Sequence, residues 1–256
     1  MNDLVLLHGW GMNNAVWGDW PAQLAAATAL TVTPLALPGH GLARVNPPLE
    51  DLDAWVSDCL SRAPTRACWL GWSLGGLVAL AAALRAPHRV TGLILIGTSP
   101  RFTAAVDWPH ALQPTLLDQF QEQLIRDPAA TLARFLALQV LHSEAGRRLL
   151  KGLRSALAAQ PAPHPAALAA GLQILRTTDL RQDLSQLTVP SLWLLGRLDA
   201  LVPIRMADDL PSHCPAATLH RFSEAAHTPF LSHPEETTAV VAAFCQRVKT
   251  SCVSDH

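Results

Sequence analysis

The sequence has 256 residues, of which half are hydrophobic and 15% are charged, and its formal net charge is −1. This composition excludes an intrinsically disordered chain, which combines low hydrophobicity with high net charge, and the length suffices for one α/β unit with a large core. Because the charge is close to zero, we expect neither nucleic acid nor a membrane surface as a partner. The longest apolar run, residues 77–84, is far shorter than the roughly 18 residues of a membrane span.

The cysteines and the first residues indicate a location. The chain has an odd number of cysteines and no CxxC pair, which favours free thiols in a reducing compartment; they are Cys59, Cys68, Cys214, Cys245 and Cys252. The opening Met-Asn-Asp lacks the basic segment and cleavage site of a secretory signal. We therefore expect a cytoplasmic protein and take it to be a monomer. No HxH, HExxH or paired-cysteine spacing is present, so we expect no metal and no cofactor.

Apolar strands alternate with helices over the first hundred residues. In chain order, the pattern predicts a strand at 4–7, a helix at 20–29, a strand at 30–37, a helix at 52–62, a strand at 67–71, a helix at 74–86 and a strand at 90–96. The first strand is a continuous apolar run, which is typical of strands buried on both faces of a parallel sheet. Regular alternation of this kind indicates right-handed crossovers and a parallel sheet.

The alternation stops after residue 101. Four helices are predicted near 112–126, 129–141, 144–159 and 165–176, with no convincing strand between them. It resumes with a strand at 189–195, a helix at 203–210, a strand at 217–222 and a helix at 235–248. We therefore predict an α/β core of residues 1–101 and 188–256, with a mostly parallel sheet flanked by helices. A helical cap of residues 102–187 interrupts this core.

The motif G-x-S-x-G is formed by residues 71–75, with Ser73 at its centre. It follows a predicted strand and opens a predicted helix, which is the strand–turn–helix context of a nucleophile elbow. The glycines allow the close backbone approach that such a turn needs. The structural alternative is that Ser73 only caps the following helix.

A nucleophilic serine needs a base, and the base needs an acid that orients it. The expected order of serine, acid and histidine is met by Asp199 and His227, which follow the strands at 189–195 and 217–222. Parallel strands end at one edge of the sheet, so both loops should lie beside the elbow. Asp183 and Asp208 are competing acids, but the first lies in the return from the cap and the second in a helix.

An oxyanion hole requires two backbone N–H donors. One should be that of Leu74, directly after the nucleophile. The second should come from the loop after the first strand, where glycines on both sides leave the N–H of Trp10 free to turn inward. In this loop His8 is expected to brace the backbone.

The chain resembles α/β-hydrolases with a helical cap, and within them the family of carboxylesterases that act on the methyl ester of pimeloyl-acyl-carrier protein in biotin synthesis. The resembling segments are 6–12 (LLHGWGM), 69–78 (WLGWSLGGLV), 134–139 (RFLALQ), 171–181 (GLQILRTTDLR) and 225–234 (AAHTPFLSHP). The resemblance implies the α/β-hydrolase fold and a triad of Ser73, Asp199 and His227. It also implies a substrate site lined by Trp10, Ser73, Leu74, Phe135, Leu136, Ala137, Leu138, Gln139 and His227. Family members usually carry a strand pair before the first strand found here, so we expect either a sheet without one or two edge strands or a misassigned start.

The implied reaction is hydrolysis of that methyl ester to methanol and the free acid, still bound to acyl-carrier protein. A feature of the sequence suits this partner: residues 126–154 contain six basic and two acidic side chains. Within them Arg147, Lys151 and Arg154 fall on one face of a predicted helix. Together with Arg134 they would dock an acidic carrier protein, although they are equally well explained as a solvated face.

Other functions share much of this pattern. A broad short-chain carboxylesterase or a thioesterase would use the same triad, and a carbon–carbon bond hydrolase of the same fold is possible. A ligand-binding relic of a hydrolase is disfavoured, because Ser73, Asp199 and His227 are all present. Dehalogenase chemistry is disfavoured because the elbow residue is a serine and not an aspartate.

Overall fold

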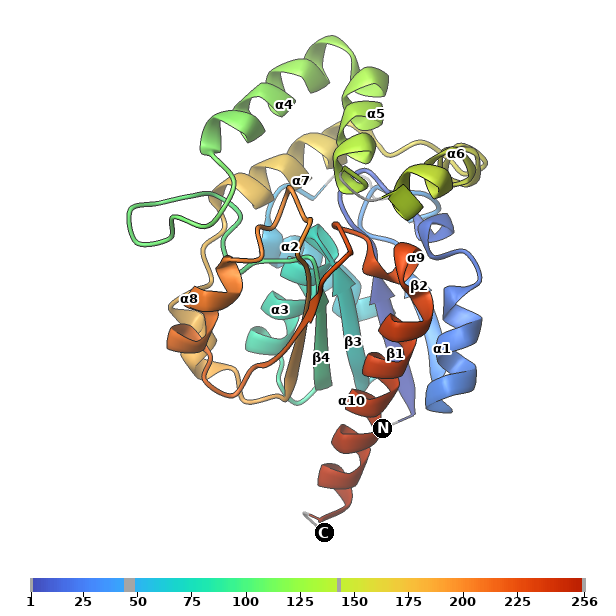
Figure 1. Ribbon diagram of the computed structural model, residues 1–256, viewed down its shortest axis with the longest axis vertical. Coiled ribbons are helices and arrows are strands. Elements are labelled where there is room, and N and C mark those ends of the chain that lie inside the picture. The colour runs from blue at the N-terminus through green and yellow to red at the C-terminus, as the bar shows by residue number, and fades with distance from the viewer. Residues whose placement is uncertain (1, 44–48, 142–143, 255–256) are drawn as a thin grey trace.

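A computed structural model of the chain describes residues 2–43, 49–141 and 144–254, as an α/β core with a group of helices above one end of its sheet (Figure 1). The sheet has six strands, all paired in parallel in the order β2-β1-β3-β4-β5-β6. They are β1 (Asp3–Leu7), β2 (Thr31–Leu35), β3 (Ala67–Trp72), β4 (Val90–Ile96), β5 (Ser191–Gly196) and β6 (Thr218–Phe222). The parallel sheet predicted from the alternation is therefore confirmed.

Side chains of successive strand residues enter two separate cores, as the period of two requires. Val5 and Leu7 of β1 face a core shared with α2, α3 and α8, whereas Leu4 and Leu6 face one shared with α1 and α10. These helices are α1 (Trp20–Thr28), α2 (Leu52–Arg62), α3 (Leu74–Arg85), α8 (Met206–His213) and α10 (Pro234–Ser254). Helices thus cover both faces, which explains why the four inner strands, β1, β3, β4 and β5, are largely apolar and buried along their length.

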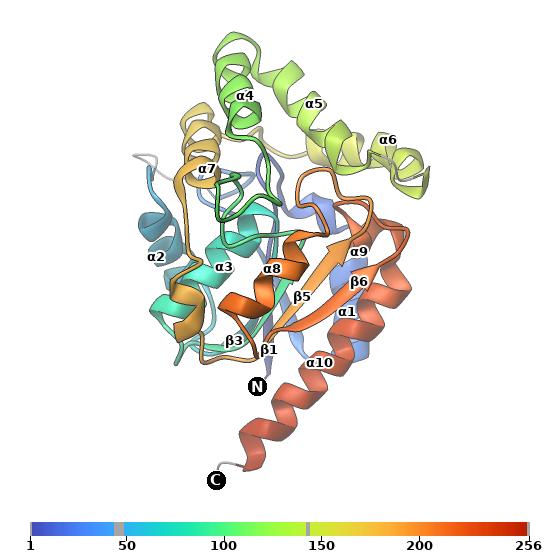
Figure 2. The same cartoon turned by 60° about the vertical axis from the view of Figure 1, so that its left-hand side comes forward.

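Four helices lie between β4 and β5 in the chain. They sit above the edge of the sheet at which the strands have their carboxyl ends (Figures 1 and 2). They are α4 (Pro114–Arg126), α5 (Pro128–Gln139), α6 (Glu144–Ala158) and α7 (Pro165–Thr177). Proline opens α4, α5 and α7, where its missing N–H costs nothing. Only isolated bridges, such as Thr103 with Leu112, replace strands in the described part of this region. We call α4–α7 the cap helices.

The two connections between the core and the cap helices are bonded to each other. Leu180 N donates to Pro100 O at 3.0 Å, and Arg101 Nη1 lies 2.7 Å from Asp179 Oδ2. Hydrogen bonds from Arg181 hold the pKa of the Asp179 carboxyl well below its usual range. The chain therefore leaves and re-enters the core at one ion-paired junction.

Several boundaries and short elements differ from the sequence prediction. The helix predicted at 203–210 begins only at Met206 and runs through Pro211 to His213, because residues 203–205 form a turn closed by Met206 N and Pro203 O. The last helix is longer than predicted. Three single-turn helices were not predicted, since they are too short for a periodic signal: η1 (Asn14–Trp17), η2 (Asp183–Gln186) and α9 (Pro229–Ser232).

Within the described residues, no helix combines the length and apolarity that crossing a membrane requires. Nor does that part of the chain bring three or more His, Cys, Asp or Glu side chains together as a metal site. Cys59, Cys68, Cys214 and Cys245 are free and buried, while the side chain of Cys252 lies outside the described structure.

Close packing of α3 against β1 generates the first prediction. A Cβ on Gly75 would lie 2.3 Å from the carbonyl oxygen of Leu7, and backbone cannot give way as a flexible side chain can. Gly75→Ala should therefore destabilise the protein by roughly 1–3 kcal/mol or more. Gly152→Ala in the exposed part of α6 meets nothing within 4 Å and should stabilise by about 0.5–1 kcal/mol. Urea denaturation of both variants checks this; equal stabilities would contradict it.

Candidate active site

Ser73 occupies a strained turn between β3 and α3. Its φ of 55° and ψ of −122° lie outside the regions that L-residues prefer. Two hydrogen bonds hold the turn: Ser73 N donates to Ile96 O at 2.9 Å, and Thr98 Oγ1 donates to Ser73 O at 2.7 Å. The side chain makes no capping bond to α3, so the interpretation of Ser73 as a simple helix cap is wrong. Strain of this kind costs on the order of 1–3 kcal/mol and concentrates at functional sites.

The turn lies where the strand order reverses. The chain passes from β1 outward to β2 and then returns to β3 on the other side of β1. Loops after β1 and β3 therefore diverge, and ligands bind in the crevice between such loops in open α/β sheets. Trp10 follows β1 and Ser73 follows β3, so both expected site residues flank this crevice.

Asp199 and His227 come together beneath the cap helices. Nδ1 of His227 lies 2.7 Å from Oδ2 of Asp199, and both side chains are fully buried. The other carboxylate oxygen of Asp199 accepts from Leu201 N and Val202 N, at 2.8 and 2.9 Å. Two backbone N–H groups thus fix the carboxylate, and its second oxygen faces Nδ1 of the His227 ring. Of the competing acids, Asp208 instead pairs with Arg221 at the surface.

The remaining ring nitrogen of His227, Nε2, is buried and has no hydrogen-bond partner among the described residues. The ring is held beside the elbow: Trp72 Nε1 donates to His227 O at 2.9 Å, and a Cβ on Gly97 would lie 3.0 Å from His227 Nδ1. Ser73 is only 2% exposed in the same place. Nε2 of His227 therefore makes no hydrogen bond to Ser73 in the described structure, and the bond between a catalytic base and its nucleophile often forms only when substrate is bound.

The two expected oxyanion donors are the backbone N–H groups of Trp10 and Leu74. Within the described chain neither Trp10 N nor Leu74 N donates a hydrogen bond, and Leu74 begins α3, whose N-terminal dipole favours negative charge. The Trp10 side chain is held by two cap helices. Its Nε1 donates to Leu168 O of α7 at 2.8 Å, and its ring centroid lies 4.8 Å from that of Phe135 of α5. Gly171 makes room for this ring, because a Cβ there would lie 2.7 Å from it.

His8 braces the loop after β1, as expected. Its Nδ1 bonds Gly9 O at 2.9 Å, and its Nε2 accepts from Leu37 N at 3.1 Å. Burial, together with the neighbouring His40, lowers the pKa of His8 to about 3. The neutral ring therefore joins the loop after β1 to the loop after β2 at neutral pH.

The side chains of residues 135–139 in α5 lie in two different environments. Phe135 and Gln139, one turn apart, are buried toward Trp10 and His227, and His227 N donates to Gln139 O at 3.2 Å. Leu136 instead points to a neighbouring cavity, and Ala137 and Leu138 are only partly buried. The side-chain oxygen and nitrogen of Gln139 are both buried with no partner in the described structure. Buried polar atoms without a partner are uncommon in folded proteins, so the side-chain amide of Gln139 is a candidate for bonding a further polar group.

The predicted basic residues lie on two different surfaces. Arg147, Lys151 and Arg154 are exposed on α6. Arg134 lies on the side of α5 that faces α4, where Nη1 donates to Gln123 Oε1 at 2.8 Å and the guanidinium covers Phe120. It therefore does not extend the α6 face directly.

Three site features were missed by the sequence analysis: the bonds made by Trp72, Thr98 and Leu168. Trp72 occupies the first variable position of G-x-S-x-G, but nothing in the pattern indicates that its indole reaches the loop of His227. Backbone acceptors such as Leu168 O leave no signal in a sequence at all.

Comparison with known proteins shows what the chain is similar to. A family model of the alpha/beta hydrolase fold matches residues 3–234. The chain is 43% identical over 245 residues to the pimeloyl-[acyl-carrier protein] methyl ester esterase of Aliivibrio salmonicida, covering 96% of this chain and 92% of that protein. It is 46% identical over 244 residues to the esterase of the same name from Pectobacterium atrosepticum, covering 95% and 94%. A solved esterase from Exiguobacterium antarcticum has the same fold, with a TM-score of 0.83, 23% identity and coverage of 96% and 92%.

The second prediction concerns Ser73 and His227 as one unit. Ser73→Ala and His227→Ala should each lower kcat for ester hydrolysis by on the order of 10⁴–10⁶, and the double variant should lose little more. The reason is that the proton transfer needs both groups. Asp199→Asn should cost as much or less. Steady-state kinetics on a chromogenic ester measures this, with circular dichroism as the folding control; additive losses would contradict a shared unit.

Proposed function

The chain belongs to the α/β-hydrolase family and is a carboxylic ester hydrolase, and on this premise we propose that it hydrolyses the methyl ester of pimeloyl-[acyl-carrier protein] in biotin synthesis, in the cytoplasm. The observation that supports this choice of substrate is the 43–46% identity to esterases of that name along nearly the whole chain. The cap helices are included in these matches. That matters because a serine elbow with an Asp–His pair serves many substrates on this fold.

The proposed mechanism assigns one role to each site residue. His227 Nε2 accepts the proton of Ser73 as its Oγ attacks the ester carbonyl, and the N–H groups of Trp10 and Leu74 stabilise the resulting oxyanion. Asp199 holds the ring and stabilises its protonated form. Methanol leaves with the proton from His227, and water attacks the acyl-enzyme with His227 again as base. The products are methanol and the carboxylic acid, and Ser73 is restored.

The cap is part of the proposal. We assign residues 102–187 to a cap and residues 1–101 and 188–256 to a core, because the two connections meet at the Arg101–Asp179 junction. In this arrangement Phe135, Leu136, Ala137, Leu138 and Gln139 contribute to the substrate site from above. Gln139 bonds a polar group of the bound acyl ester, since it lies against His227 and its amide has no partner among the described residues.

Acyl-carrier protein is the proposed partner, and the exposed basic residues of α6 support it. Charges of this kind steer an acidic partner toward the entrance of a site, more than they add to final affinity. Arg134 lies on a different surface, toward α4, so in this proposal it would contact the carrier protein separately from the α6 face.

Incubation with methyl pimeloyl-acyl-carrier protein, followed by mass spectrometry of the carrier, tests the function. Loss of the methyl group by the wild type and not by Ser73→Ala is expected. A broad esterase would hydrolyse short free esters equally well or better, a thioesterase would release the acyl chain from the carrier, and a binding relic would do neither. Any of these three results contradicts the proposal.

The third prediction separates stability from activity at Gln139. Gln139→Met removes two unpaired buried polar atoms and should raise the free energy of unfolding by about 1–3 kcal/mol. It should also lower kcat/KM for the methyl ester, by roughly 2–10-fold for one lost hydrogen bond. Gln173→Met on the exposed side of α7 is the matched control and should change neither. Urea denaturation and steady-state kinetics of both variants measure these two effects. A lower free energy of unfolding for Gln139→Met would contradict the prediction, because it would mean that the amide is paired in the free protein.

The fourth prediction concerns the basic face of α6. Changing Arg147, Lys151 and Arg154 together to alanine should raise KM for the carrier-bound ester and flatten its dependence on salt, because exposed charges act over about 8–10 Å. Arg66→Ala, at the opposite end of β3, is the charge control. Kinetics at low and high salt, beside a short soluble ester, measures the effect. An equal loss on both esters would assign these residues to cap stability, and no loss would leave them a solvated surface.

A further inference from the structure

Trp72 is the last residue of β3 and lies directly before Ser73 in the chain. Its side chain is fully buried, and its Nε1 donates to the backbone oxygen of His227 at 2.9 Å, although 155 positions separate the two residues in the sequence. One side chain therefore joins the segment that carries the proposed nucleophile to the loop that carries the proposed base. We propose that Trp72 is a positioning residue for ester hydrolysis, which sets where His227 lies relative to Ser73.

The neighbours of Trp72 fix the plane of its indole. The rings of Phe230 and Trp17 meet it in T-shaped contacts, with centroids at 5.2 and 6.3 Å and interplanar angles of 71° and 68°. The six-membered ring lies against the loop after β1, since a Cβ on Gly9 would lie 3.2 Å from Trp72 Cε3. Because the indole cannot turn in this packing, its N–H stays directed at the carbonyl of His227.

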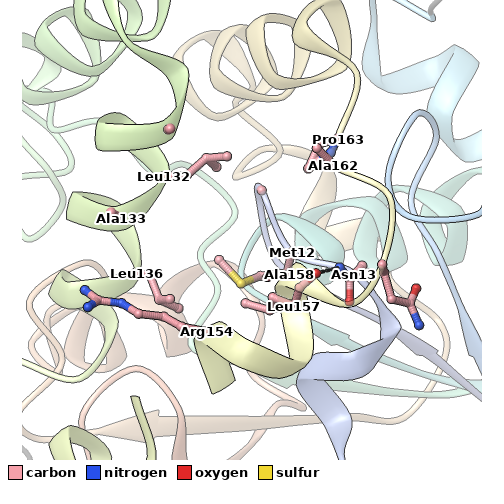
Figure 3. Close-up of a pocket in the computed structure, with 13 residues that line it drawn as sticks. Met12, Asn13, Leu132, Ala133, Leu136, Arg154, Leu157, Ala158, Ala162 and Pro163 are labelled. Atoms are coloured by element: carbon pink, nitrogen blue, oxygen red, sulfur yellow. Dashed lines mark hydrogen bonds between the residues drawn. The ribbon is translucent and has the colours of Figure 1, made fainter. Parts of the chain in front are cut away.

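The backbone of His227 is held from two directions. Its N–H donates to Gln139 O of α5 at 3.2 Å, and its C=O accepts from Trp72. The first of these bonds reaches a cap helix. Figure 3 shows a comparable bond, in which Asn13 Nδ2 of the loop after β1 donates to Leu157 O of α6 at 3.1 Å. The bond from Trp72 instead stays within the core, so it holds His227 irrespective of the position of α5.

Trp72 acts on the reaction through His227 and not by touching the substrate. It is fully buried, and it is not among the residues that line the cavity of about 450 Å³ between α5 and α6 (Figure 3). The ring of His227 is also held at Nδ1, which lies 2.7 Å from Asp199 Oδ2 and against the backbone of Gly97. Loss of the bond at the carbonyl lets the whole residue shift, and a misplacement of about 1 Å costs on the order of 100-fold in rate.

Two substitutions separate the N–H of Trp72 from its volume. Trp72→Phe removes the donor and keeps much of the apolar bulk. Trp72→His keeps an N–H at the place of indole Nε1, because the five-membered rings superimpose, but loses the six-membered ring. Trp72→His should therefore have the lower midpoint of urea denaturation. For a positioning residue the order in kcat is the opposite, with a loss of about 10–100-fold in Trp72→Phe and a clearly smaller loss in Trp72→His.

Trp69→Phe is the matched control. Trp69 lies on the same strand and is also buried, but its Nε1 has no hydrogen-bond partner in the part of the chain that the structure describes. This variant loses the same atoms and should keep the wild-type kcat. Steady-state kinetics on a chromogenic ester measures kcat, with the active serine titrated to completion by a fluorophosphonate so that unfolded protein is not counted. A wild-type kcat in Trp72→Phe, or kcat values that follow the order of stability, would overturn the proposal.

Hydrogen exchange of the indole N–H groups tests the bond in the wild type, whether or not a variant folds. The measurement is made by NMR on protein labelled with ¹⁵N at tryptophan. The N–H of Trp72 should exchange more slowly than that of Trp10, whose acceptor, Leu168 O, lies on the cap helix α7. Exchange of both at the same rate, or faster exchange at Trp72, would contradict an anchor that stays within the core.

This inference rests on the proposed roles of Ser73 and His227, and the two proposals fail in different ways. If Ser73→Ala and His227→Ala retain ester hydrolysis, the proposed mechanism is wrong and the positioning role falls with it. If both variants lose ester hydrolysis while Trp72→Phe keeps the wild-type kcat, only the positioning role of Trp72 is refuted.

Discussion

The turn at Ser73 is the constraint on which the rest of the site depends. A serine with positive φ must be enforced by its surroundings, and here the enforcement is contact between backbones. A Cβ on Gly71 would lie 2.3 Å from Gly75 O, and one on Gly75 would lie equally close to Leu7 O. The first turn of α3 can therefore sit directly on the ends of β1 and β3. This packing places the N-terminus of α3 and the loop after β1 on either side of Ser73.

The pattern of strands and the identities of the proposed triad were readable from the sequence because both have a strong local signature. Apolar runs and the elbow motif depend on neighbours in the chain, and parallel topology then places Asp199 and His227 at the same sheet edge. Asp183, Asp199 and Asp208 all lie between Ser73 and His227 in the chain, so the sequence favoured Asp199 only through its predicted place in the loop after a strand. The 2.7 Å contact of Asp199 with His227 is a long-range fact of packing.

Other features could not be predicted because they depend on what the cap helices meet. The five residues 135–139 were expected as one substrate-lining set, yet a helix turns through more than a full circle over that length. Leu136 consequently faces a cavity that Phe135 and Gln139 do not. Arg134 resembles the α6 residues in charge and lies near them in sequence, but helix geometry directs it toward Phe120 of α4. Local composition therefore overstated the continuity of the basic surface.

The cap helices do more than cover the site, since each proposed catalytic loop is bonded to one of them. The loop of His227 is joined to α5 through Gln139 O, and the Trp10 side chain is joined to α7 through Leu168 O. The proposed base and one proposed oxyanion donor are thus each bonded to a different cap helix, whereas the hydrogen bonds found for the Ser73 backbone are to the core. A movement of α5 or α7 away from these loops would break one of these bonds. In the proposed mechanism, the arrangement that completes the oxyanion hole and orients His227 is therefore the closed one, in which water is excluded from the reacting carbonyl.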